Sequence, residues 1–335
     1  MTLFTRHRHI GTAELPVEGY LPGFGGATGW LNSAPLTVED LGGKVVLVDF
    51  WTYTCINWLR TLGYVRAWAE KYEDEGLVVV GVHTPEFGFE ADAENVAEAA
   101  KALNVPYAIA LDPDSAVWQA FANHYWPAVY IADADGRIRH HQFGEGGYEE
   151  CEMVVQQLLR AAGRDDVPGG LVSVSAEGVE AQADWSSLGS PETYVGYRQG
   201  RNFASPGGVT IDEPHVYSLP ETLRLNSWAL SGEWTVEGGA SVLTEGGGAI
   251  AFRYHARDVN LVLRSRTGDA VPFRLHVDGL PPAAAHGLDV DAAGNGIVVQ
   301  PRLYQLVRQP GSITDRTFEI TFLEPGVEAY VFTFG

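Results

Sequence analysis

Residues 45–58 read Val-Val-Leu-Val-Asp-Phe-Trp-Thr-Tyr-Thr-Cys-Ile-Asn-Trp, and this stretch decides the fold of the first half of the chain. An apolar run without polar alternation is typical of a strand covered on both faces, and here it leads into a cysteine at the start of a helical pattern. A second cysteine three residues later would complete a Cys-x-x-Cys redox motif, but Trp58 stands at that position. The sequence therefore predicts one attacking thiol, Cys55, without a local resolving thiol.

Strand and helix patterns alternate through the first half of the chain, which indicates a βαβ architecture. The strands are expected at residues 45–51, 77–83, 107–111, 128–131 and 138–143. The helices are expected at residues 56–73, 91–103, 115–123 and 148–162. Asp135-Gly136 separates the last two strands, and this dipeptide predicts a hairpin.

Beyond about residue 205 the pattern changes to short alternating segments separated by Gly, Pro and Asp, with no convincing helix. Strands are expected at residues 249–255, 259–265, 273–277, 297–306, 317–323 and 329–334. Turn signals at this spacing predict an all-β sandwich. We therefore expect an N-terminal extension (1–28), an α/β domain (29–165), a linker (166–200) and a β-sandwich domain (201–335).

Composition excludes several classes of function. The 335 residues carry a net charge of -21 without a local basic patch, which argues against binding to nucleic acid or to an anionic membrane. Two cysteines are too few for a disulfide framework or a cysteine-rich zinc site. No stretch approaches the roughly 20 apolar residues of a membrane span, and residues 1–11 lack the apolar segment of a secretory signal. The sequence as given predicts a cytoplasmic protein, or an extracytoplasmic one if a signal or anchor was trimmed.

The surroundings of Cys55 favour a reactive thiol. A cysteine attacks as its thiolate, and the start of a helix stabilises an anion through unpaired backbone N–H groups. The hydroxyls of Thr52 and Thr54 and the amide of Asn57 are within plausible hydrogen-bonding range of the thiol. Asp49 lies in the preceding strand, where a buried carboxylate would act as a proton acceptor.

Two motifs together resemble the thioredoxin superfamily, in its TlpA-like branch: Val-Leu-Val-Asp-Phe-Trp-x-x-x-Cys and Trp-Pro-Ala-Val-Tyr-Ile. Residues 30–41, 81–90, 143–148 and 190–197 extend the likeness to the extracytoplasmic C-terminal half of DipZ-type cytochrome c biogenesis proteins. That half joins a TlpA-like domain to a jelly roll similar to a carbohydrate-binding module. The resemblance therefore implies a thioredoxin-like fold followed by a jelly-roll sandwich.

By this resemblance Cys55 is the nucleophile, Asp49 the buried acid beneath it, and Pro127 a cis-proline that faces the thiol. Gly144 would line the same edge of the site. The neighbours of these residues are Thr52, Tyr53, Thr54, Asn57, Trp58 and Trp126. The resemblance implies thiol–disulfide exchange without a cofactor or metal. The sequence departs from the pattern at Trp58 and does not include the membrane-spanning half.

Several partners could resolve a mixed disulfide at Cys55. An external protein thiol or a low-molecular-weight thiol is one class, and Cys151, near Gly144 in the sequence, is a less favoured candidate. Thr52 stands three residues before Cys55, as in one-cysteine peroxidases, which makes peroxidase chemistry a minor alternative.

A redox-inactive binding module is an alternative of a different class. It would present an aromatic recognition surface beside the thiol, formed by Trp58, Tyr53, Trp126 and Phe87. Packing of these rings in the core is the competing interpretation.

Other polar and aromatic groups are assigned to structure in preference to binding. His83, Glu86 and Glu90 have the chemistry of metal ligands, but loop and capping roles are favoured. Asp289-x-Asp291-x-x-Gly294 resembles the start of a calcium loop without its full ligand set, so a polar turn is expected. The sandwich has four candidates for a carbohydrate platform, for which core packing is favoured: Trp228, Trp234, Tyr254 and Tyr304. A docking partner for the sandwich stays open.

Overall fold

The structure is a computed structural model that describes residues 14–335. The chain divides into two compact units, and the boundary lies between Ala176 and Glu177. Residues 1–11, for which no secretory signal is predicted, lie outside the described residues. Within residues 14–335, no helix has the length and apolar character needed to cross a membrane.

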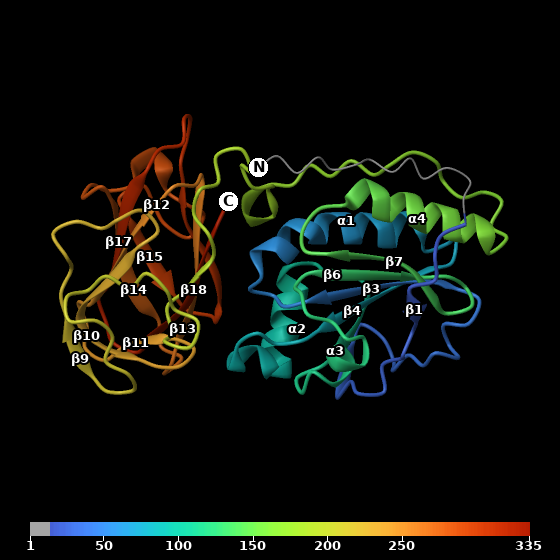
Figure 1. Cartoon of the computed structure of the whole chain (residues 1–335), viewed down its shortest axis with the longest axis horizontal. Coiled ribbons are helices and arrows are strands. Elements are labelled where there is room, and N and C mark those ends of the chain that lie inside the picture. Colours follow the sequence, from blue (N-terminus) through green and yellow to red (C-terminus); the bar gives the residue numbers. More distant parts are fainter. Residues whose placement is uncertain (1–13) are drawn as a thin grey trace. The chain divides into compact units, whose positions relative to one another are not determined.

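The first unit is built on a seven-stranded sheet with the strand order β1-β7-β6-β3-β4-β5-β2. Figure 1 labels β7, β6, β3 and β4 of this sheet. Strand β3 lies in its centre, parallel to β4 and antiparallel to β6. All seven residues of β3 are buried, which explains why the segment is continuously apolar except for Asp49. The strands are β1 (Gly19–Tyr20), β2 (Gly29–Leu31), β3 (Val45–Trp51), β4 (Leu77–His83), β5 (Ala108–Leu111), β6 (Ala128–Ala132) and β7 (Arg137–Phe143).

Helices cover both faces of this sheet. Figure 1 shows α1 and α4 on one face and α2 and α3 on the other. The helices are α1 (Ile56–Tyr72), α2 (Ala93–Ala102), α3 (Ala116–Ala120) and α4 (Tyr148–Ala161), and the short 3₁₀ helix η1 (Gly88–Ala91) precedes α2. Helix α3 is shorter than the predicted 115–123 because Ser115 and Ala122 adopt positive φ angles of 57° and 49°. The thioredoxin-like α/β fold predicted for this half is confirmed.

The segment after α4 is fastened to the helical face of the first unit. The Glu152 side chain is buried, and its Oε1 accepts hydrogen bonds from Lys71 Nζ at 2.8 Å and from the Tyr72 hydroxyl at 2.7 Å. Its Oε2 accepts the backbone N–H of Val172 at 2.8 Å. Part of the segment predicted as a linker (166–200) is therefore held by a charged, largely buried contact.

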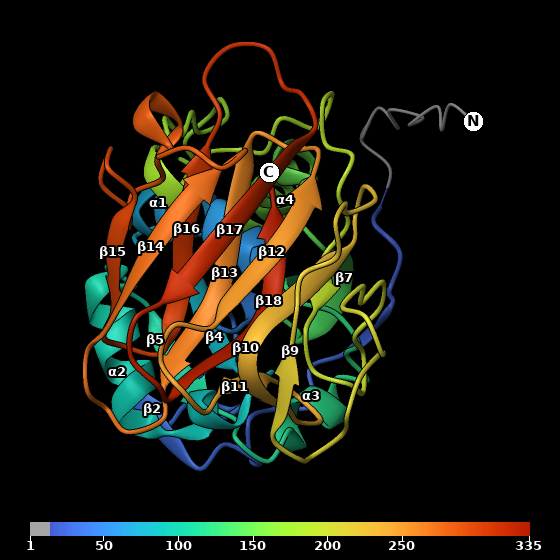
Figure 2. The same cartoon turned by 90° about the vertical axis from the view of Figure 1, so that its left-hand side faces the viewer.

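The second unit is an all-β sandwich, as predicted from its turn spacing. Its two sheets are joined through β10 (Trp228–Val236): residues 228–231 pair with β12 (Ala249–Tyr254), and residues 234–236 pair with β11 (Ser241–Leu243). Gly232, with a φ of 87°, lies where the strand passes from one sheet to the other. Figure 2 shows β10, β12, β17 and β14 side by side in one sheet. The other strands are β8 (Thr193–Tyr194), β9 (His215–Tyr217), β13 (Asp258–Ser265), β14 (Val271–Val277), β15 (Asn295–Val298), β16 (Arg302–Arg308), β17 (Arg316–Phe322) and β18 (Val327–Phe334).

The four aromatic side chains considered for a carbohydrate platform belong to the core of the sandwich. Trp228, Trp234, Tyr254 and Tyr304 are each at most 1% exposed. The platform hypothesis is therefore wrong for these rings, and the favoured core assignment is confirmed.

Two local features of the sandwich also test the sequence interpretation. The strand predicted at residues 297–306 is two strands, because the chain turns at Pro301 between β15 and β16. Asp291 Oδ1 accepts the backbone N–H groups of Ala293 and Asn295 at 2.9 and 2.8 Å, which confirms the polar turn expected there.

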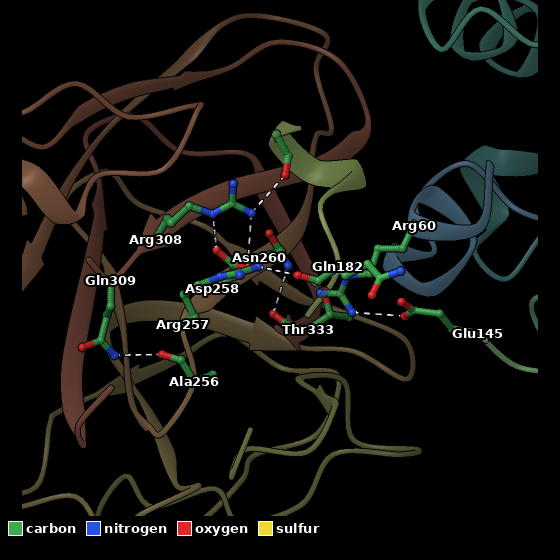
Figure 3. A network of polar contacts seen from close by, with 11 residues as sticks. Arg60, Glu145, Gln182, Ala256, Arg257, Asp258, Asn260, Arg308, Gln309 and Thr333 are labelled. Carbon is green, nitrogen blue, oxygen red and sulfur yellow. Dashed lines mark hydrogen bonds and ion pairs between the residues drawn. The ribbon is translucent and has the colours of Figure 1, made fainter. Parts of the chain in front are cut away.

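A buried carboxylate with two arginines fixes the start of the second unit. Asp258 is 1% exposed, and Arg257 and Arg308 contact it from 2.7 and 2.6 Å (Figure 3). The same two arginines donate to the backbone carbonyls of Gln182 and Gly178, at 2.6 and 3.0 Å. The cluster therefore holds residues 178–182 against the sandwich.

Candidate active site

Cys55 lies at the junction of β3 and α1, where the chain turns from strand to helix. It is the N-cap residue of α1, with φ -75° and ψ 110°, and its side chain is partly exposed. Its backbone N–H donates to the carbonyl of Thr52 at 3.2 Å, and its carbonyl accepts the N–H of Leu59 at 3.0 Å. The nucleophile predicted from the sequence therefore stands at a helix N-terminus, where the backbone field favours a thiolate.

The loop before β6 carries Pro127, which the resemblance predicts to border the site. The Trp126–Pro127 peptide bond is cis, and the Pro127 carbonyl accepts the N–H of Gly144 at 2.8 Å. Trp126 is partly exposed and donates from its indole nitrogen to the carbonyl of Thr84 at 3.1 Å. The loops before β6 and after β7 are thus joined to each other, and the loop before β6 is also joined to the end of β4.

Trp58, which stands in place of a second active-site cysteine, is a core residue. Its side chain is 0% exposed and stacks on Trp51, with ring centroids 4.2 Å apart and an interplanar angle of 20°. Its indole N–H donates to Asp49 Oδ2 at 2.9 Å. The side chain at position 58 therefore donates a hydrogen bond to the buried acid.

Asp49 lies on β3 in an environment that opposes its ionisation. It is 0% exposed, and burial raises its pKa to about 6, although hydrogen bonds from Trp58 and Tyr107 act in the opposite direction. The Tyr107 hydroxyl donates to Oδ2 at 3.2 Å, whereas Oδ1 has no hydrogen-bond partner among the described residues. Asp49 is thus a buried acid with one oxygen already engaged by two donors.

Tyr107 was not identified from the sequence, although a neighbouring glycine gives a signal for it. Gly81 on β4 pairs with Asp49 on β3. A Cβ atom at Gly81 would lie 2.8 Å from the indole nitrogen of Trp51 and 3.0 Å from Tyr107 Cε2. A glycine inside a buried strand marks a close approach of this kind.

The aromatic recognition surface considered for a binding module is not formed as predicted. Trp58, Tyr53 and Phe87 are 0%, 5% and 8% exposed, so three of its four rings are buried. Only Trp126 is partly exposed. The competing interpretation, in which these rings pack inside the fold, is correct for the three.

Cys151 is a buried thiol in the first turn of α4. It is 1% exposed, and burial raises its pKa to about 12. His140 Nε2 lies 3.7 Å from its sulfur. The two cysteines are not joined by a disulfide. Burial keeps the Cys151 thiol protonated, which disfavours attack on a mixed disulfide at Cys55.

Glu90, in the segment after β4, has a structural role, and His83 is buried at the end of β4. Glu90 Oε2 accepts the backbone N–H groups of Glu86 and Phe87 at 2.8 and 2.9 Å, which confirms a capping role. His83 is 2% exposed, and burial lowers its pKa to about 3. Within residues 14–335, no group of three or more His, Cys, Asp or Glu side chains is arranged to hold a metal ion.

Known proteins match each unit of the chain. Residues 21–154 match the family model described as Redoxin, and residues 190–335 match the one described as Thioredoxin like C-terminal domain. The thiol-disulfide oxidoreductase YkuV of Bacillus subtilis is 32% identical over 139 residues, which are 42% of this chain and 93% of that protein. The chain belongs to the thioredoxin superfamily.

Longer relatives span both units of this thioredoxin-superfamily chain. Protein DipZ of Mycobacterium tuberculosis and its counterpart in Mycobacterium bovis are 39% identical over 280 residues, or 81% of the chain. The match spans 39% of the length of each DipZ protein. A solved structure, described as a thioredoxin-like protein in the oxidized form, is 33% identical and covers 43% of this chain and 96% of its own, with a TM-score of 0.40. By its match to the Redoxin model and to YkuV, the first unit is similar to thiol-disulfide oxidoreductases.

Proposed function

We propose that the first unit carries out thiol–disulfide exchange through Cys55 alone. The observation that carries this proposal is the position of Trp58, whose buried indole donates to Asp49 where a second thiol would complete the motif. Cys55 keeps the helix-start position and partial exposure that a nucleophilic thiol needs. The substrate class is a disulfide of a protein or of a low-molecular-weight thiol.

The reaction has two exchange steps. The Cys55 thiolate attacks one sulfur of the substrate disulfide, so that a mixed disulfide with Cys55 forms and the other substrate sulfur leaves as a thiolate. The thiolate of an external thiol then attacks the substrate sulfur of the mixed disulfide and releases Cys55 as its thiolate. Each step breaks one disulfide and forms another, so no further oxidant or reductant is needed.

An external thiol is proposed to resolve the mixed disulfide because Cys151, the other cysteine of the chain, is unsuited to attack it. Its burial and raised pKa leave it without the thiolate that attack requires. The proposed resolving partner is a small thiol or an exposed protein cysteine.

The test is to expose the full chain to oxidised glutathione and to measure intact mass. We expect one glutathione per chain for the wild type and for Cys151→Ser, and none for Cys55→Ser. Reduced glutathione should then remove the adduct from the wild type. Equal labelling of Cys55→Ser and the wild type would contradict the proposal.

A second variant tests the role of Trp58. Trp58→Cys places a thiol three residues after Cys55, within reach for a disulfide in the same turn. We expect insulin reduction with a dithiol reductant to rise above that of the wild type. Trp58→Ser is the matched control, since it opens the same space without a second thiol. An increase in both variants would trace the effect to that space.

A further inference from the structure

The last residue of β4 and the segment after it contact the two residues that precede Cys55 in the sequence. The Thr54 hydroxyl donates to Glu90 Oε1 at 2.6 Å. The Tyr53 ring stacks on His83, with centroids 5.6 Å apart, and lies 6.2 Å from the ring of Phe89. The turn that presents the thiol is therefore held from a loop more than 30 residues away in the sequence.

Glu90 is itself held rigidly. Its side chain is 0% exposed, and its other oxygen, Oε2, accepts the backbone N–H groups of Glu86 and Phe87. The carboxylate therefore bridges the backbone of its own loop to the side chain of Thr54. Because both ends of this bridge are buried, movement of Thr54 would take a hydrogen-bond donor away from a desolvated carboxylate, which is costly.

We propose that Glu90 is a positioning residue for Cys55, which acts by holding Thr54 and thereby fixing the thiol at the N-terminus of α1. This inference rests on the proposed function, because it concerns the presentation of the attacking sulfur. Displacement of about 1 Å at a reacting group can reduce a rate about 100-fold. In a site with one thiol, the reaction rate depends on the position of that single sulfur atom. The Thr54–Glu90 contact is therefore important for the reaction as well as for the fold.

Two matched pairs of variants test the positioning role in a Cys151→Ser background, so that Cys55 is the one thiol. Thr54→Val keeps the shape and removes the hydroxyl, whereas Thr54→Ser keeps the hydroxyl. Glu90→Ala removes the hydrogen bonds from Thr54 and from the two backbone N–H groups. Glu90→Gln can keep them, with its oxygen toward the two backbone N–H groups and its NH₂ group toward the Thr54 hydroxyl.

The readout is the rate constant for alkylation of Cys55 by iodoacetamide in the full chain, with the midpoint of urea unfolding measured in parallel. We expect Thr54→Val and Glu90→Ala to react about 10-fold more slowly, a factor that corresponds to about 1.4 kcal/mol. Thr54→Ser and Glu90→Gln should recover most of the rate.

Alkylation at the wild-type rate in Thr54→Val, together with a lower unfolding midpoint, would overturn the positioning role and leave a contact that serves only stability. If Thr54→Val does not fold, equal alkylation rates in Glu90→Ala and Glu90→Gln would overturn it in the same way. Alkylation requires no disulfide exchange. Failure of the proposed function would appear instead as wild-type chain that is alkylated at Cys55 and forms no adduct with oxidised glutathione.

Discussion

Replacing Asp49 by asparagine should change how the stability of the chain depends on pH. The carboxyl group is 0% exposed, and its pKa rises from 3.8 to about 6. A folded chain that holds this proton more tightly than the unfolded chain is most stable when Asp49 is protonated. Its contribution is therefore fully present below pH 3.8 and is lost as the pH rises through 6.

The magnitude follows from the displacement of the pKa. A difference of about 2 pKa units at about 1.36 kcal/mol per unit gives a loss of about 3 kcal/mol between pH 4 and pH 7. An asparagine side chain cannot ionise, so the Asp49→Asn variant should lack this loss. At pH 4 the variant should be less stable than the wild type by about 1–3 kcal/mol, because its NH₂ group replaces an oxygen that has no hydrogen-bond partner within residues 14–335.

The assay is urea unfolding of the full chain between pH 4 and pH 8, with the variant compared to the wild type at each pH. Other carboxyl groups titrate in both proteins, so only the difference in unfolding free energy is read. That difference should move by about 3 kcal/mol in favour of the variant as the pH rises. Asp114→Asn, at an exposed position, is the control. A difference that stays within about 1 kcal/mol across the range would refute the reasoning.

Three further predictions concern other contacts. Trp58→Phe keeps a ring against Trp51 and removes the donor to Asp49, so the free energy of unfolding at pH 7 should fall by about 1.5–3 kcal/mol; an unchanged urea midpoint would contradict the role of that hydrogen bond. Iodoacetamide should label Cys55 in the native chain and label Cys151 only after denaturation, which peptide mass spectrometry can resolve; rapid native labelling of Cys151 would show that it opens. Glu152→Ala should accelerate hydrogen exchange at the Val172 amide, because the variant lacks the carboxylate that accepts this N–H, whereas Glu149→Ala, at an exposed position of the same helix, should leave it unchanged.

Local sequence patterns predicted the central strands and the first helix of the first unit closely, but they did not predict the short edge strands β1 and β2. Strands β3 and β4 begin and end at the predicted residues, and α1 ends one residue early at Tyr72, because fully buried strands and a long helix give strong, continuous patterns. In the sandwich, β10 was missed. Its pattern is interrupted at Ser231-Gly232, where the strand leaves one sheet for the other, and that exchange depends on tertiary pairing.

For the candidate site, the strand-to-helix pattern placed Cys55 at the start of a helix, and the family resemblance pointed to Pro127 and Gly144, whose roles stay predictions. The sequence did not indicate what Trp58 does. The Trp58 indole reaches Asp49 from the first turn of α1, which follows the strand that carries Asp49. The Tyr107 hydroxyl reaches the same oxygen from 58 residues away. The contact between Thr54 and Glu90 spans 36 residues. These contacts exist only when β3, the start of α1, η1 and the residue before β5 are assembled, so no local pattern encodes them.

The second unit can complete its fold only after strand β18 has been synthesised. All eight residues of this strand, Val327–Phe334, are buried, and it pairs with β13, which is encoded more than 60 residues earlier. Gly335 and Asp258 also exchange backbone hydrogen bonds. A nascent chain on the ribosome therefore cannot close this sandwich until residue 334 has left the exit tunnel, and until then the edge of β13 that pairs with β18 keeps its backbone N–H and C=O groups unpaired. Chaperone binding during translation, and rapid proteolysis of any product that stops before Val327, are the expected cellular consequences.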